Sequence, residues 1–273
     1  MIDEKAKQEA ENYLNQAKLH NKKGATAQAV AAYQTADKIF IEYSDERGRT
    51  VCWSGIAKAY GKSKELDRAV AAFAEAARHA VLADWPDKEI DVLYNMGLTL
   101  QQMGTKGANL KQVGQAIDAF KQGLATAERI GDKQSEGVLL LSLGFACAWS
   151  NRDEEGIEYF DRAASFALQG IDFDTAFSAL SSLGVMLSNN GRPAEAIPHY
   201  ERALELSKTQ EGDIVAVADT YANLGIAYEK AGHLEKAIEA MEIYSEILQH
   251  AGDVKAADAK AMVKRLKIKG KLK

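Results

Sequence analysis

One pattern of apolar and small residues occurs six times along the chain at a spacing of about 40 residues, and it constrains the fold more than any other feature. The clearest copy runs from Leu180 to Ala203 and holds two segments with apolar residues at helical spacing, separated by Gly191. Small residues equivalent to Gly184 follow one another at steps of 40, 40, 47, 40 and 41 residues: Ala17, Ala57, Gly97, Gly144, Gly184 and Gly225. A fixed period of this size indicates a solenoid of stacked units.

Each copy predicts a hairpin of two helices. In the copy at Gly184, Ala196 follows twelve residues later and Tyr200 sixteen residues later. We expect the two small residues to let the helices approach closely, and the aromatic ring to fill the space between them. A single hairpin cannot bury its apolar face, so neighbouring hairpins must stack.

The period predicts an all-α, right-handed solenoid of six helical hairpins and a C-terminal capping helix, in one domain over residues 1–273. Only three prolines interrupt the chain, as expected for helices. Seven inserted residues, within 104–115, predict a longer loop inside the third hairpin. The expected repeats are 3–44, 45–84, 86–130, 132–170, 172–211 and 213–251, with a capping helix over 253–268 and a basic tail over 264–273.

These repeats resemble the tetratricopeptide repeat, from about Glu9 to Leu248. That motif has Leu-Gly, Tyr, Ala, Phe and Ala at matching offsets and a usual period of about 34 residues. The longer period here is similar to that of the long-helix variant in kinesin light chains and Leu-Gly-Asn scaffold proteins. The resemblance implies a scaffold for protein–protein interaction.

The sequence contains no convincing catalytic or metal-binding motif. None of the five histidines pairs with another at a metal-ligand spacing, and neither cysteine completes a ligand set. The segment Gly55-x5-Gly61-Lys62-Ser63 resembles a phosphate-binding loop, but it has five residues between the glycines instead of four and lies in a predicted helix. We therefore expect no enzyme activity, no metal and no cofactor.

Charge and cysteine usage favour a cytoplasmic protein. The N-terminus is charged from Asp3 onward, no run of 18 apolar residues occurs, and Cys52 and Cys147 are two repeats apart. The net charge is −5, although the last ten residues hold six basic side chains and no acid. An acidic body argues against a dedicated nucleic-acid binder. The tail is interpreted either as a solvated helix end or as a contact for an anionic surface.

The resemblance also implies where a ligand would bind. In tetratricopeptide proteins the first helices line a concave groove, with contacts three residues before the small residue, and one and five residues after it. Helical geometry places these three positions on one stripe. An Asn two residues before the small residue holds the ligand backbone in some members. The candidate groove residues are Lys18, Lys22, Lys58, Lys62, Tyr94, Asn95, Leu98, Leu141, Phe145, Trp149, Val185 and Asn223.

The stripe begins with four lysines and continues with apolar and aromatic residues. It predicts a peptide or helix ligand that carries acidic and apolar residues. Two alternatives stay open for the side chains: the lysines form a solvated face, and Phe145 and Trp149 pack between neighbouring first helices. The two-carboxylate clamp of the chaperone-tail-binding members is absent, because none of its five positions matches (Leu14, Lys18, Gly55, Asp91 and Asn95).

Two other functions remain as alternatives. The first is a scaffold that self-assembles into homo-oligomers, with the groove receiving part of another copy. A weaker alternative is a regulatory module that contacts nucleic acid or an anionic surface through the basic tail.

Overall fold

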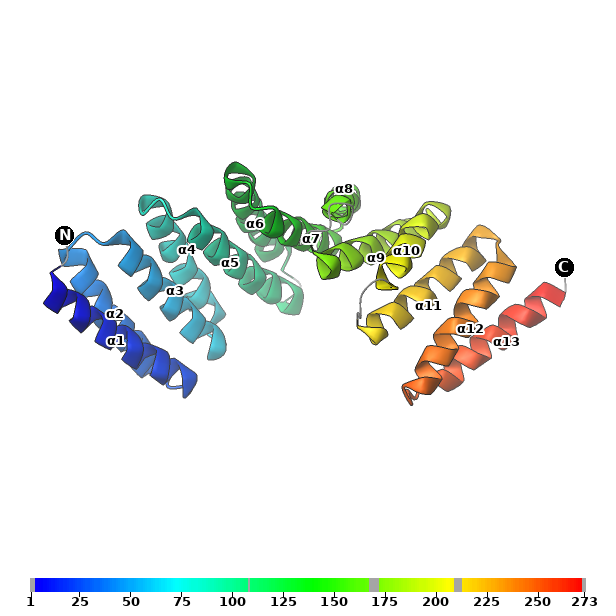
Figure 1. Ribbon diagram of the computed structural model, residues 1–273, viewed down its shortest axis with the longest axis horizontal. Coiled ribbons are helices and arrows are strands. Elements are labelled where there is room, and N and C mark those ends of the chain that lie inside the picture. The colour runs from blue at the N-terminus through cyan, green and yellow to red at the C-terminus, as the bar shows by residue number, and fades with distance from the viewer. Residues whose placement is uncertain (1–2, 108, 167–171, 209–212, 272–273) are drawn as a thin grey trace. The chain divides into compact units, whose positions relative to one another are not determined.

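The chain is helical throughout the part that the structure describes. The computed structural model describes residues 3–107, 109–166, 172–208 and 213–271, and these contain thirteen α-helices and no strand (Figure 1). They divide into two compact units, Met1–Ser150 and Asn151–Lys273. The all-α helical-repeat architecture is therefore confirmed, whereas one continuous solenoid over 1–273 stays a prediction.

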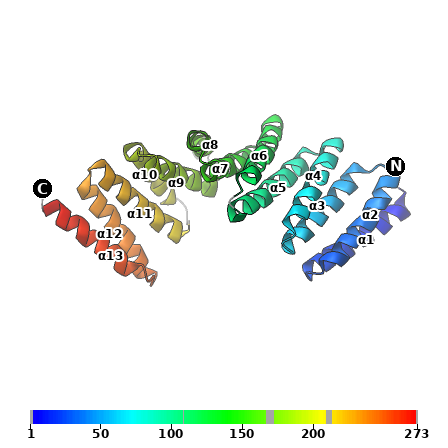
Figure 2. The same cartoon turned by 180° about the vertical axis from the view of Figure 1, so that it is seen from behind.

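The first unit contains three hairpins and a seventh helix. Each hairpin joins two helices that lie side by side in both views (Figures 1 and 2): α1 with α2, α3 with α4, and α5 with α6. The second helix of each hairpin also contacts the next first helix. The helices are α1 (Glu4–Lys22), α2 (Thr26–Glu42), α3 (Glu46–Lys62), α4 (Leu66–Leu82), α5 (Pro86–Gly107), α6 (Leu110–Ile130) and α7 (Lys133–Trp149).

The second unit repeats this arrangement. Helix α9 pairs with α10, α11 pairs with α12, and α13 packs against α12. The predicted capping helix is thus present, although it begins and ends three residues later than expected. The helices are α8 (Asp153–Ser165), α9 (Phe173–Asn189), α10 (Pro193–Ser207), α11 (Ile214–Ala231), α12 (Leu234–His250) and α13 (Ala256–Lys271).

Small residues allow the two helices of a hairpin to approach closely, as the period predicts. A Cβ on Gly184 would lie 2.6 Å from Cε1 of Tyr200, and a Cβ on Gly225 would lie 2.9 Å from Cγ of Met241. Both side chains are almost completely buried. The packing of these two hairpins therefore depends on a glycine, which has no side chain, opposite a large side chain.

The backbone conformation at the helix ends repeats as regularly as the small and large residues that pack inside the hairpins. The residues that follow helices α1 to α4 adopt left-handed backbone conformations at twenty-residue steps, at Gly24, Ser44, Lys64 and Asp84. Aspartate also caps helices: the side chain of Asp132 accepts a hydrogen bond from the amide of Ser135 at 3.1 Å.

The insertion in the third repeat does not form the predicted loop. Helix α5 continues to Gly107 and α6 begins at Leu110, so the extra residues lengthen both helices. The side chain of Asn109 caps α6 by accepting from the amide of Lys111 at 3.1 Å. A Cβ on Gly104 would lie 2.5 Å from Cγ2 of Val113, so this glycine permits a close crossing and does not break the helix.

A hydrogen bond to a buried histidine connects the two helices of the second hairpin. His79 on α4 has no exposed surface, and its Nδ1 hydrogen-bonds Oε2 of Glu46 at the start of α3. The third hairpin has a similar contact, in which the hydroxyl of Thr126 on α6 donates to Oε1 of Glu89 on α5 at 2.9 Å. Such pairs satisfy polar groups that would otherwise be buried without a partner.

Candidate functional site

The first helices of the first unit carry the predicted stripe on their exposed side. Helix α1 contacts α3, and α5 contacts α7. The positions one and five residues after each small residue are exposed on all four helices, whereas the position three residues before is partly or fully buried. The exposed members are Lys18, Lys22, Lys58, Lys62, Leu98, Gln102, Phe145 and Trp149.

The four lysines have their charges available. Lys18 and Lys22 lie on α1, and Lys58 and Lys62 lie at the same offsets on α3. All four are exposed, and none forms an ion pair within the described part of the chain. The stripe therefore offers four ammonium groups, on two helices that contact each other.

The apolar half of the stripe lies on α5 and α7. Leu98 is 40%, Phe145 39% and Trp149 58% exposed. Part of the surface of Phe145 and of Trp149 is therefore in contact with solvent. Exposed large apolar side chains that cluster in this way are typical of partner-binding surfaces.

Two further apolar members are held by the hairpin beneath them. Tyr94 is partly buried, and its ring lies 6.1 Å, centroid to centroid, from the ring of Phe120 in the core of α5 and α6. Leu141 on α7 is also partly buried. Both side chains therefore offer less surface to a ligand than the exposed members of the stripe do.

The asparagines and Val185 differ from the rest of the set. The amide of Asn95 donates to the carbonyl oxygen of Asp91 at 2.6 Å and to its carboxylate at 2.9 Å, so in this conformation the amide is engaged within α5. Val185 on α9 and Asn223 on α11 are partly buried and belong to the second unit.

A small cavity lies beside Tyr94, and no motif in the sequence predicted it. Its volume is about 260 Å³, and it lies between the first turns of α5 and α7. Asp87 on its rim is exposed and forms no ion pair with a described residue, whereas Asp91 pairs with Lys88 at 2.5 Å. Asp87, Asp91 and Tyr94 share one helix face by spacing alone. The three groove offsets, three residues before and one and five residues after the small residue, do not include Asp87 or Asp91. The lining residues are Asp87, Ile90, Asp91, Tyr94, Gln134, Ser135, Val138 and Leu139.

Half of the basic tail is bound to its own unit. Arg265 and Lys269 both contact Glu229 on α11, at 2.6 and 2.9 Å, and Lys267 contacts Glu242 on α12 at 2.5 Å. These pairs hold α13 to the preceding hairpin. Lys273, the last residue of the predicted tail, lies outside the described residues.

The described residues contain no cluster of three or more side chains suited to hold a metal ion. Cys52 and Cys147 are buried and do not form a disulfide with each other. Within the same ranges, no helix is long and apolar enough to cross a membrane.

Comparison with known proteins supports the tetratricopeptide resemblance. Residues 175–257 match the tetratricopeptide repeat family model. A sequence search of curated proteins finds no match.

Several solved structures share the fold. The structure of BtubC (BKLC) from P. vanneervenii is 18% identical, with a TM-score of 0.65, over 88% of this chain and 92% of that one. The TPR-like repeats of a putative kinesin light chain from Podosopora anserina are 15% identical, with a TM-score of 0.58, over 76% and 97%. A signal transduction ATPase with a tetratricopeptide repeat sensor from Pyrococcus horikoshii is 16% identical, with a TM-score of 0.70, over 93% of this chain and 38% of that one.

The family prediction is therefore confirmed for residues 175–257, which match the tetratricopeptide repeat model, and the fold of the chain is similar to that of the TPR-like repeats of a putative kinesin light chain. Proteins of the tetratricopeptide repeat family are in general interaction scaffolds without catalytic activity, and the matching family model is not that of an enzyme. At these low identities the structural likeness establishes the fold alone.

Proposed function

We propose that the protein is a non-enzymatic, cytoplasmic scaffold whose first unit binds a peptide or helix with acidic and apolar residues. The observation that supports this best is that four exposed lysines on α1 and α3 form no ion pair with a described residue and share the stripe with the exposed side chains of Leu98, Phe145 and Trp149 on α5 and α7.

The proposed ligand binds in one orientation. Its acidic residues lie against α1 and α3, where Lys18, Lys22, Lys58 and Lys62 are exposed. Its apolar residues contact Phe145 and Trp149, because large aromatic side chains provide most of the binding energy in such interfaces. Exposed charges contribute more to orientation and association rate than to affinity.

A peptide selection tests this proposal without knowledge of the natural partner. Random 12-residue peptides are displayed and selected on the immobilised full chain. We expect enriched peptides to contain Asp or Glu on one side of Leu, Phe or Trp. The same selection on the Lys58→Glu/Lys62→Glu variant is expected to lose these sequences.

The matched control reverses two charges outside the stripe. Lys38 on α2 and Lys111 on α6 are exposed and form no ion pair with a described residue, so Lys38→Glu/Lys111→Glu changes the net charge equally. Selection of the same peptides by both variants would contradict the proposal, as would enrichment of basic peptides by the unmodified chain.

A further inference from the structure

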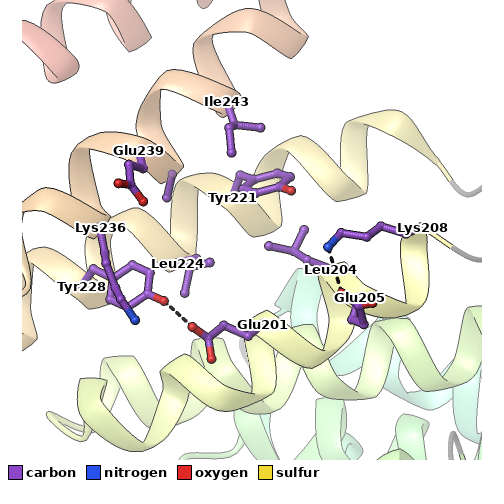
Figure 3. Close-up of a pocket in the computed structure, with 11 residues that line it drawn as sticks. Glu201, Leu204, Glu205, Lys208, Tyr221, Leu224, Tyr228, Lys236, Glu239 and Ile243 are labelled. Atoms are coloured by element: carbon purple, nitrogen blue, oxygen red, sulfur yellow. Dashed lines mark hydrogen bonds and ion pairs between the residues drawn. The ribbon is translucent and has the colours of Figure 1, made fainter.

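A second cavity lies in the second unit, among α10, α11 and α12 (Figure 3). Its volume is about 290 Å³, at the lower end of the size of small-molecule sites. Leu204, Leu224 and Ala240 form a buried apolar floor, and Ile243 beside them is 38% exposed. The cavity therefore has space and apolar surface for one or two side chains from a partner.

Two carboxylates on the walls of this cavity lack a cationic partner. Glu201 on α10 and Glu239 on α12 lie on two sides of it, with Leu224 of α11 between them (Figure 3). Glu201 accepts a hydrogen bond from the neutral hydroxyl of Tyr228, and neither glutamate forms an ion pair with a described residue. Burial and the bond to Glu201 raise the pKa of Tyr228, which keeps this hydroxyl protonated.

The two lysines at the cavity have other contacts. Lys208 pairs with Glu205 at 2.8 Å, and the ammonium of Lys236 lies 5.3 Å from the centroid of the Tyr228 ring. They therefore leave Glu201 and Glu239 to attract a cation from outside.

The chain itself carries a matching surface on α13. Lys260, Lys264, Ile268 and Lys271 follow one another at steps of four, four and three residues, which places them on one helix face. All four are exposed, Ile268 by 52%, and none of the three lysines forms an ion pair with a described residue. The other basic residues of α13 are held by Glu229 and Glu242, so this face is the one left for a partner.

We propose that α13 of one copy binds in the α10–α12 cavity of a second copy. Ile268 contacts the apolar floor, and Lys264 lies between Glu201 and Glu239. The contact joins two copies, because α13 packs against α12 within its own chain. The two surfaces differ, so the contact is heterologous and extends into a ring or an open chain of copies.

The α10–α12 cavity and the exposed face of α13 both lie outside the proposed groove. Charge complementarity favours α13 as the occupant of the cavity. The last ten residues contain six basic side chains and no acid, in a chain of net charge −5. An unrelated basic peptide or a small cation is an alternative occupant that the experiment separates.

The test is a charge exchange in the full chain, followed by light scattering over a range of concentrations. We expect the mass of the unmodified protein to rise with concentration. Glu239→Lys and Lys264→Glu should each weaken association by about tenfold or more, because each places like charges together. The double variant should associate again, since the exchange restores opposite charges at these two positions across the contact.

Mixing the two single variants gives a sharper result. The Glu239→Lys chain keeps an intact α13, and the Lys264→Glu chain keeps an intact cavity. Their mixture should associate like the unmodified protein, with the two chains in alternating order, because one kind of contact is unchanged and the other carries the exchanged charges. Glu235→Lys and Lys255→Glu serve as matched controls, because both residues are exposed and lie outside the two surfaces.

Three results would overturn the inference. The first is a strict monomer up to about 1 mM, which excludes any useful self-affinity. The others are equal association of all variants and failure of the mixture to associate. A monomer that nevertheless binds an unrelated lysine-rich peptide in this cavity would assign the cavity to a different occupant. Peptide binding by the groove should persist in Glu239→Lys, so the two proposals fail separately.

Discussion

Gly184 on α9 faces the ring of Tyr200 on α10 so closely that a Cβ on residue 184 would lie 2.6 Å from Cε1 of that ring. Real Cβ atoms essentially never approach another heavy atom below 3.0 Å. Tyr200 is 1% exposed, so its ring cannot move into solvent. The same relationship holds between Gly97 and Phe120. It explains why a small residue and an aromatic residue recur together along the chain.

We predict that Gly184→Ala destabilises the fold. The added methyl group overpacks the hairpin, which costs about 1–3 kcal/mol of unfolding free energy. Chemical denaturation followed by circular dichroism measures this change. The control is Gly114→Ala on α6, where a Cβ would meet nothing within 4 Å. Because Ala is the better helix former, the control should gain up to about 1 kcal/mol. Equal stability of the two variants would contradict the packing account.

The Glu46–His79 contact predicts a second stability effect. Glu46→Ala removes the acceptor of a fully buried imidazole nitrogen, and an unsatisfied buried group costs about 1–3 kcal/mol. Thermal or urea unfolding checks this value. Glu11→Ala on α1, an exposed position without such a contact, should change stability little. An unchanged midpoint for Glu46→Ala would show that His79 finds another partner.

His199 predicts a dependence of stability on pH. Burial, with a smaller contribution from the charge of Arg202, lowers the pKa of this half-buried imidazole below its usual value. The unfolded chain therefore binds more protons, and the folded state loses stability as the pH falls below about 6.5.

His199→Gln removes this titration. The stability of the unmodified protein should fall more steeply than that of the variant between about pH 7 and pH 5. Urea unfolding at several pH values measures the difference. Parallel curves for the two proteins would argue that His199 does not titrate differently on folding.

The lysine stripe predicts that ligand binding depends on salt. Exposed charges are screened beyond about 10 Å at 0.1 M salt, so a selected acidic peptide should bind more weakly as salt rises. The Lys58→Gln/Lys62→Gln variant should show a flatter dependence, because two of the four charges are gone. Fluorescence anisotropy at increasing NaCl concentrations gives both slopes. Identical slopes would remove the lysines from the site.

The hairpins were predictable because their determinants repeat. Gly184 and Tyr200 interact within one hairpin, and the same 16-residue spacing between a small and a large residue occurs in five of the six repeats, so the sequence displays the contact repeatedly. Exposure of Lys58 and Phe145 was predictable for a similar reason, since helical geometry alone determines which face a residue occupies.

Other features depend on packing between distant residues. Gly104 resembled a loop signal, but it allows α5 to cross close to Val113, so the helices lengthened instead. Glu46 and His79 are 33 residues apart, and no local pattern links them. The cavities beside Tyr94 and Glu239 depend on how neighbouring side chains leave space, which the period does not encode.

Calorimetric titration of a selected peptide into a Phe145→Ala/Trp149→Ala variant tests the proposed groove most directly. Val81→Ala/Leu82→Ala is the matched control, because these side chains on α4 are 58% and 60% exposed and lie outside the stripe. Loss of two aromatic anchors should weaken binding by at least about tenfold, since such residues commonly contribute about 2 kcal/mol or more each. The control should bind like the unmodified protein. Equal affinity of both variants for the peptide would contradict the account of the groove.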